Sequence, residues 1–236
     1  LIAKGSITRE AAAFLEQMVK AGYSILIGGG TSSGKTTFLN ALSNAIPHEE
    51  RIITIEDSAE LQIQGVENLV RLEAKPANME GNREITIRDL IRASLRMRPD
   101  RVIVGEVRDS AAIDMLTAMN TGHDGSLSTG HANSAYDMIT RLESMVLMGI
   151  ELPMEAVRRQ IASAVDIIIH LGRLRDGSRK VTEICEVTGI ENGQVQLTSL
   201  YEFEEQAEKG RKTVQGHLKK KAALQNKEKL KRAGLE

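Results

Sequence analysis

The sequence predicts an α/β fold with a mostly parallel sheet and a C-terminal antiparallel β-hairpin appendage. Two observations support this prediction. Through the first two thirds of the chain, short apolar runs alternate with helical patterns of about ten residues, which is typical of a parallel sheet covered on both faces. Further on, the dipeptides Asp176-Gly177 and Asn192-Gly193 indicate hairpin turns beside longer strand-like runs.

The individual elements follow from these patterns. Strands are predicted at the apolar runs 24–27, 51–55, 69–72, 102–104, 126–128 and 166–171. Helices are expected at 36–45, 87–97, 110–120, 135–148 and 154–165, with Ser110 as the N-cap of the third. The runs 180–190 and 194–201 flank the turn at Asn192-Gly193 and form the hairpin appendage.

Composition excludes several classes of protein. The 236 residues are 41% hydrophobic and 27% charged, which is typical of a globular chain and excludes wholesale disorder. A net charge of −1 and only 3% aromatic residues argue against direct nucleic-acid binding. The lone Cys185 excludes an internal disulfide framework and favours a reducing compartment. No apolar run reaches the length of about 18 residues that a membrane span needs.

Charge is unevenly distributed along the chain. Residues 205–236 contain ten Lys or Arg against four Asp or Glu, while the preceding residues contain 21 against 28, a net charge of −7. The apolar residues of this tail follow no helical period. We therefore expect residues 204–236 to be a basic tail, helical or disordered in solvent. Contact with a polyanion or a membrane surface is the alternative.

A phosphate-binding loop is predicted at residues 28–37, GGGTSSGKTT, between an apolar strand and a helix. From Gly29 this segment fits G-x-x-x-x-G-K-[ST], in which backbone N–H groups and a helix N-terminus face phosphate oxygens. Lys35 is expected to reach the β- and γ-phosphates, and the Thr36 hydroxyl to bind Mg²⁺. Nucleotide contacts are predicted for Gly29, Gly30, Thr31, Ser32, Ser33, Gly34, Lys35, Thr36 and Thr37. A glycine-rich turn with a surface lysine is the alternative.

Acidic residues follow two of the predicted strands. Glu106 ends the run 102–104 through Gly105, a usual position for a group that holds Mg²⁺ or its water beside a phosphate loop. Glu56, Asp57 and Glu60 follow the strand 51–55, at the sheet edge where ligands bind. One of these three would orient or deprotonate an attacking water. A solvated loop or a helix N-cap at Asp57 is the alternative.

Histidines and arginines supply further candidates. His123 and His131 flank a short strand, and a neutral histidine would sense or donate to a γ-phosphate; a metal site and two hydrogen-bonded loop histidines are the alternatives. Arg88, Arg92 and Arg96 share one helix face, where like charges repel mildly and an anionic partner would help; a solvated face is expected, and contact with a nucleotide or with an acidic face of a neighbouring subunit is the alternative. A further set of arginines stays unranked: Arg71, Arg83, Arg98 and Arg108.

Taken in order, these segments resemble the secretion-ATPase superfamily of type II and type IV secretion systems and type IV pili. Members carry a phosphate loop, an acidic Asp box, a Walker B motif ending in Gly-Glu, and a His box. The matching segments here are GGGTSSGKTT, RIITIEDSAEL, LRMRPDRVIVGEVRD and TGHDGSLSTGHANS. Residues 73–109 and 118–134 most resemble the ATPase of the tight-adherence (Tad/Flp) pilus branch, called CpaF or TadA, with conjugation-type secretion ATPases as close neighbours.

The resemblance implies a fold and an activity. Residues 1–203 would form a RecA-like ATPase domain, without the family's N-terminal domain, and residues 204–236 the basic tail. Such a domain hydrolyses ATP with Mg²⁺ in a cytoplasmic hexamer, docked on an inner-membrane platform protein, to drive pilus assembly or protein export. A conjugation-type ATPase, a DNA-translocating relative, a nucleotide-bound scaffold and a small-molecule kinase are the alternatives.

The resemblance also implies residue roles. Lys35 and Thr36 match the phosphate-loop pair, and Glu106 matches the Walker B acid near Mg²⁺. Glu60 matches the acid that activates water, with Glu56 and Asp57 as the other Asp-box acids. His123 and His131 match the His-box histidines, so the expected catalytic residues are Lys35, Glu60, Glu106 and His131.

One residue departs from the family pattern. Ser32 stands where the family usually has glycine, and a positive φ there would cost about 1 kcal/mol. Nucleotide binding is expected to survive that cost. Because the family's N-terminal domain usually supplies arginines to the nucleotide, weak binding and slow hydrolysis are expected of this chain.

Overall fold

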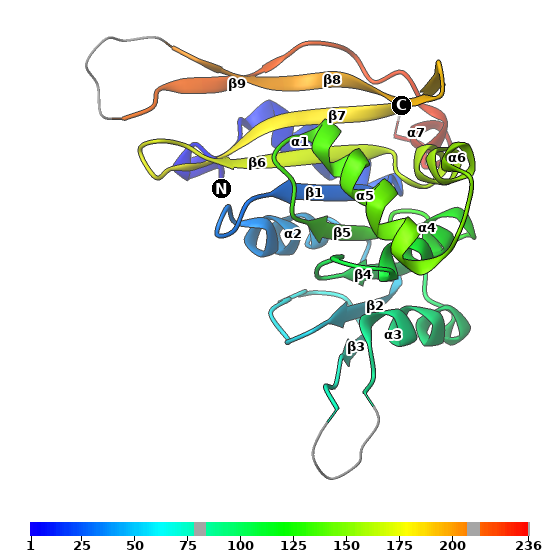
Figure 1. Cartoon of the computed structure of the whole chain (residues 1–236). Helices are drawn as coiled ribbons and strands as arrows, with labels where there is room; N and C mark the ends of the chain where they lie inside the picture. Colours follow the sequence, from blue (N-terminus) through cyan, green and yellow to red (C-terminus); the bar gives the residue numbers. More distant parts are fainter. Residues whose placement is uncertain (78–83, 207–212, 236) are drawn as a thin grey trace.

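The computed structural model describes residues 1–77, 84–206 and 213–235. Its strands form one sheet in the order β3-β2-β4-β5-β1-β6-β7-β8-β9 (Figure 1). Six strands are mutually parallel: β1 (Ile25–Gly29), β2 (Arg51–Glu56), β3 (Asn68–Glu73), β4 (Arg101–Val104), β5 (Leu127–Gly130) and β6 (Ile167–Arg173). Three more continue the sheet in antiparallel fashion: β7 (Arg179–Glu191), β8 (Gln194–Glu205) and β9 (Gly216–Lys220). The predicted α/β fold with an antiparallel appendage is confirmed.

Helices cover both faces of the sheet. One face packs against α3 (Ile87–Ser94), α4 (Ala111–Asn120), α5 (Ala135–Gly149) and α6 (Met154–Ala164). The other face packs against α1 (Arg9–Lys20), α2 (Lys35–Ser43) and α7 (Glu228–Arg232). Short 3₁₀ turns occupy η1 (Ile2–Lys4) and η2 (Leu95–Met97). Among these described elements, no helix is both long and apolar enough to cross a membrane.

The central strand β1 shows why this sequence requires two covered faces. All five of its residues are buried. Ile25 and Ile27 pack on the side of α1 and α2, while Leu26 packs on the side of α4 to α6, because successive side chains of a strand point to opposite faces. Since β1, β2, β4 and β5 are parallel, the segments that follow them all leave the sheet at the same edge.

Helix α1 was not among the predicted elements. Its buried residues Ala11, Leu15, Met18 and Val19 follow helical spacing, and the Thr8 hydroxyl caps its start by accepting from the Ala11 N–H. The signal was therefore present in the sequence.

Helix α4 starts as predicted, but the Asp109 carboxylate caps it: Asp109 Oδ1 accepts from the Ala111 N–H at 2.8 Å, and Ser110 makes no side-chain cap.

The expectation of a helical or disordered basic tail is wrong for the described tail residues that form a strand. Gly216–Lys220 form strand β9 against β8, and only Glu228–Arg232 are helical. Leu218, Leu224 and Leu230 join the core on the α1 side of the sheet. These leucines follow no single period because each belongs to a different local structure. Residues 207–212 and 236 of the predicted tail lie outside the description.

Candidate functional site

The phosphate loop turns tightly between the end of β1 at Gly29 and the start of α2 at Lys35. A Cβ on Gly29 would lie 2.4 Å from Ser33 Oγ and 2.7 Å from the Leu171 carbonyl oxygen, so only glycine fits there. Gly34 has φ 97°, which glycine adopts without strain. The loop backbone can therefore approach a ligand closely.

Ser32 adopts a left-handed conformation, with φ 58°. Glycine is usual at this position in the secretion-ATPase superfamily that the sequence resembles. A non-glycine residue in this region is strained by about 1 to 2 kcal/mol. Ser32 is exposed at the tip of the loop.

The Lys35 side chain is buried and folds back against the phosphate loop. Its Nζ donates to the carbonyl oxygens of Gly29 and Gly30, at 3.1 and 3.2 Å, and lies 3.8 Å from Glu106 Oε1. Burial lowers the pKa of Lys35, and the nearby Glu106 carboxylate opposes that shift. Phosphate oxygens at the loop would stabilise the charged form more strongly than these two carbonyls do.

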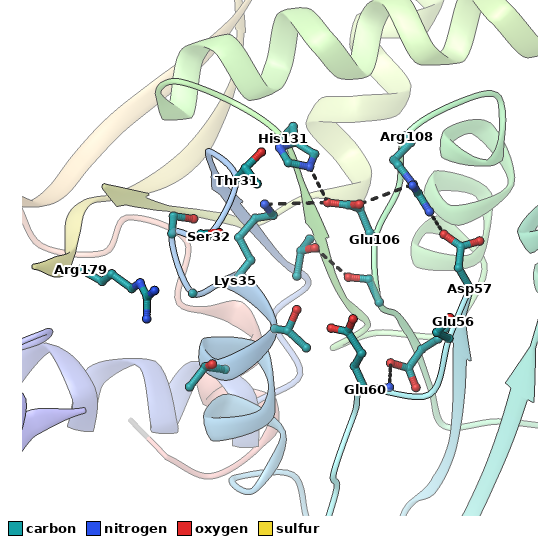
Figure 2. Close-up of a pocket in the computed structure, with 17 residues that line it drawn as sticks. Thr31, Ser32, Lys35, Glu56, Asp57, Glu60, Glu106, Arg108, His131 and Arg179 are labelled. Atoms are coloured by element: carbon teal, nitrogen blue, oxygen red, sulfur yellow. Dashed lines mark hydrogen bonds and ion pairs between the residues drawn. The ribbon is translucent and has the colours of Figure 1, made fainter. Parts of the chain in front are cut away.

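Glu106 contacts Lys35, His131 and Arg108, of which Arg108 belongs to its own segment and the other two to different segments (Figure 2). Its Oε1 lies 3.2 Å from His131 Nε2, and its Oε2 lies 3.4 Å from Arg108 Nε. The Arg108 guanidinium also pairs with the Asp57 carboxylate. The segment after β4 is thus tied to those that follow β2 and β5.

The three acids that follow β2 have different surroundings. Glu56 is buried, and its Oε1 accepts from the N–H groups of Glu60 and Leu61 at 3.0 and 2.9 Å. Asp57 is paired with Arg108. Glu60 is exposed in the cavity, and Glu56 holds its backbone in place. Of the three acids, Glu60 is the one whose carboxylate makes no hydrogen bond or ion pair with the residues that the structure describes.

These side chains line a cavity of about 580 Å³ at the carboxyl edge of the sheet. Its lining includes loop residues 31–37 and the following side chains: Glu56, Asp57, Glu60, Glu106, Arg108, Thr129, His131 and Arg179. Gly29 and Gly30 contribute the carbonyls that hold Lys35. All but one of the predicted site residues therefore gather here.

The exception is His123, which does not line this cavity. Its Nδ1 lies 3.2 Å from the Ala118 carbonyl oxygen, near the end of α4. The reason is topological: His123 precedes β5 and His131 follows it, so the four-residue strand separates them by roughly 13 Å. Proximity in sequence does not bring the two histidines together.

The candidate arginines have different surroundings in the structure. Arg88 and Arg92 share one anionic partner within the chain, Asp114 on α4, with N–O distances of 2.6 and 2.8 Å. Arg108 enters the cavity, and Arg83 lies outside the described residues. Arg179 was not among the candidates. It lies more than 140 positions after the loop, so no local pattern could have connected the two.

The site suits a magnesium-bound nucleotide better than a protein-caged metal. Within residues 1–77, 84–206 and 213–235, no group of three His, Cys, Asp or Glu side chains has metal-binding geometry. Mg²⁺ is usually held by one or two protein oxygens, with phosphate and water as its other ligands. Thr36 and Glu106, both in the cavity lining, can supply such oxygens. The buried Ser33 Oγ has no hydrogen-bond partner among the described residues, which fits a loop shaped for a ligand.

Comparisons with known proteins agree with this geometry. The family model described as "Type II/IV secretion system protein" matches residues 1–233. A putative conjugal transfer protein of Mycobacterium tuberculosis is 42% identical over 201 residues, covering 85% of this chain and 56% of that protein. The chain therefore spans about half the length of the curated relatives it matches.

Two solved structures are similar. The VirB11 ATPase of the Brucella suis type IV secretion system, in complex with sulphate, has a TM-score of 0.68 and 35% identity, covering 75% of this chain and 53% of that one. The pilus retraction motor PilT with bound ADP has a TM-score of 0.54 and 26% identity, covering 79% and 49%. These similarities confirm the predicted RecA-like fold.

Proposed function

Because the chain belongs to the type II/IV secretion system protein family, we propose that it is the ATP-binding and ATP-hydrolysing motor domain of a secretion or pilus-assembly ATPase. One observation carries this proposal. Lys35, Glu60, Glu106 and His131 come from four separate segments, yet they line one cavity beside the phosphate loop. Binding alone would need only the loop, whereas the added acids and histidine suit hydrolysis.

Each side chain has a defined role in this proposal. The Lys35 ammonium leaves the carbonyls of Gly29 and Gly30 and binds the β- and γ-phosphate oxygens. Thr36 and Glu106 would hold Mg²⁺, which would neutralise charge on the phosphates. Glu60 orients the attacking water and accepts its proton. His131, beside Glu106 Oε1, donates to the charge that develops on the γ-phosphate.

The finer assignments rest on the family. We propose a homohexamer that docks on an inner-membrane platform protein and acts at the cytoplasmic face of the membrane through its partners, without direct nucleic-acid contact. Assignment to the Tad/Flp pilus branch rests on the motif stretches 73–109 and 118–134 alone. The named conjugal transfer and VirB11 relatives support the conjugation-type alternative.

Phosphate release from ATP, measured against protein concentration, tests the proposal. Specific activity should rise with concentration if neighbouring subunits complete the site, and chelation of Mg²⁺ should abolish it. Lys35→Ala and Glu106→Gln should lose nearly all ATP hydrolysis while remaining folded by circular dichroism. The site assignment is wrong if both variants hydrolyse ATP like the parent. Tight ATP binding without turnover would indicate a scaffold instead.

A further inference from the structure

We propose that Arg179 is a nucleotide-binding residue whose guanidinium contacts the α-phosphate of a nucleotide held at the phosphate loop. The inference rests on the proposed ATPase function and adds a phosphate contact from the antiparallel part of the sheet. Arg179 is the first residue of β7, directly after the turn that joins β6 to β7. It lines the same cavity as Lys35 and Glu106.

Arg179 lies against the phosphate loop. Its Cδ lies 3.6 Å from the place that a Cβ on Gly34 would occupy, so its side chain lies against the last turn of the loop. Figure 2 shows Arg179 on one side of the loop and Glu106 on the other. The guanidinium therefore faces the start of α2 from the side opposite the acids.

Two of the three lysine and arginine side chains in the cavity already lie near a carboxylate. The cations of this cavity are Lys35, Arg108 and Arg179, and its carboxylates come from Glu56, Asp57, Glu60 and Glu106. Lys35 lies near Glu106, and Arg108 pairs with Asp57. The exposed Arg179 guanidinium makes no hydrogen bond or ion pair with any residue that the structure describes. It is therefore free to bind a phosphate, and a planar guanidinium suits two phosphate oxygens at once.

A second cavity indicates which phosphate Arg179 contacts. This cavity, of about 290 Å³, shares Ser33, Gly34, Thr37 and Arg179 with the main one, so Arg179 lies where the two meet. Its other walls include the apolar side chains of Phe38 and Val181. A nucleotide with its terminal phosphate near Glu106 and its nucleoside in this second cavity would place its α-phosphate beside Arg179.

The proposed contact has a distinct kinetic signature. The bond broken in hydrolysis joins the β- and γ-phosphates, so the charge on the α-phosphate changes little during the reaction. An interaction made equally in the ground and transition states lowers KM and leaves kcat unchanged. Arg179 should therefore contribute to nucleotide affinity for ADP and ATP alike.

Binding of ADP and ATP by isothermal titration calorimetry, together with steady-state hydrolysis, tests the inference. Arg179→Ala should weaken both affinities about tenfold and raise KM by the same factor, with kcat within about twofold of the parent. Arg179→Lys should restore part of the affinity. Arg173→Ala is the matched control, because Arg173 is the exposed register partner of Arg179 on β6 and does not line the cavity.

The outcomes separate this inference from the proposed function. If Lys35→Ala weakens ADP binding while Arg179→Ala does not, the Arg179 inference fails and the ATPase proposal stands. If neither variant changes ADP binding, both fail. If Arg179→Ala lowers kcat at unchanged KM, Arg179 acts on the chemical step and the α-phosphate assignment is wrong. An equal loss of affinity in Arg173→Ala would show a general effect of the hairpin and also overturn the assignment.

Discussion

His131 Nε2 lies 3.2 Å from Glu106 Oε1, and that same oxygen lies 3.8 Å from the Lys35 ammonium. One carboxylate oxygen therefore faces both the histidine after β5 and the lysine at the start of α2. The second carboxylate oxygen faces Arg108. Since Glu106 is the contact shared by these segments, we expect the catalytic effects of Glu106 and His131 to be coupled.

The coupling gives the first prediction. Glu106→Gln should lower kcat for phosphate release about 100-fold or more, because Glu106 would hold the Mg²⁺ that neutralises phosphate charge. His131→Ala should lower it about tenfold, because His131 donates to the charge that develops on the γ-phosphate. The double variant should be no slower than Glu106→Gln, since residues that act as a unit are not additive. Measured kcat values for the single and double variants test this. Independent roles would instead make the two losses multiply.

The second prediction concerns the left-handed turn at Ser32. Ser32→Gly removes a strain of about 1 to 2 kcal/mol, while the greater freedom of glycine in the unfolded chain offsets about 0.5 to 1 kcal/mol of that gain. The relief of strain is the larger effect, so Tm should rise by about 1 to 3 °C in a chain of this size. Differential scanning calorimetry measures this directly.

Ser32→Ala provides the matched control. It keeps a Cβ in the left-handed region and should leave Tm near that of the parent. Equal or lower Tm values for Ser32→Gly would show that the loop imposes no net strain on Ser32.

The elements of the site that could be predicted from sequence are those encoded in local patterns. The phosphate loop, the acids after β2 and Glu106 after β4 each lie next to the strand that positions them. Parallel strands bring these segments to one edge, so the cavity follows from the fold class. The departure at Ser32 was also visible as a single residue in a motif.

The remaining features depend on contacts between distant parts of the chain. Arg179 reaches the loop only because β6 lies beside β1 and turns into β7. His123 looked equivalent to His131, but a strand separates them. Leu218 and Leu224 appeared unpatterned because Leu218 lies in β9 and Leu224 in the irregular segment after it, so no single period relates them. No local period or motif encodes such contacts.

The third prediction is a pH dependence centred on His170. Its Nε2 donates to the Ala132 carbonyl oxygen at 3.3 Å, and its Nδ1 accepts from the Thr182 hydroxyl at 2.7 Å, so β6 and β7 hold the segment that follows His131. Burial lowers the pKa of His170, against the opposing effects of the Ala132 carbonyl and the Glu183 and Asp137 carboxylates.

The lowered pKa of His170 makes the folded protein less stable as the pH falls. Below the ordinary histidine pKa of 6.5, the unfolded chain binds a proton that the folded chain does not. This contribution to stability is therefore full above about pH 6.5 and is lost as the pH falls towards the lowered pKa, by at most about 1.4 kcal/mol per pH unit. Urea unfolding at pH 7.5 and 5.5 should show a smaller difference for His170→Gln than for the parent. An unchanged difference would exclude His170 as a source of the pH dependence.

The fourth prediction tests whether the C-terminal helix belongs to the stable core. The Asp166 carboxylate is largely buried beside β6, where its Oδ2 accepts from the Ser24 N–H and from Lys229 Nζ, both at 2.7 Å. Burial raises the pKa of Asp166, and the Lys229 ammonium on α7 opposes that shift. Removing the ammonium leaves a buried carboxylate with poor compensation, which is costly.

Lys229→Met should therefore lower the free energy of unfolding by about 2 to 3 kcal/mol, and Asp166→Asn added to it should recover part of that loss. Lys219→Met is the matched control, because Lys219 and its partner Glu204 are both exposed; its cost should stay below about 0.5 kcal/mol. Urea unfolding at pH 7 gives all the values. If Lys229→Met costs no more than Lys219→Met, the Lys229–Asp166 ion pair does not tie α7 to the stable core. A large cost confined to Lys229→Met means that α7 unfolds together with the sheet, as its buried Leu230 also requires.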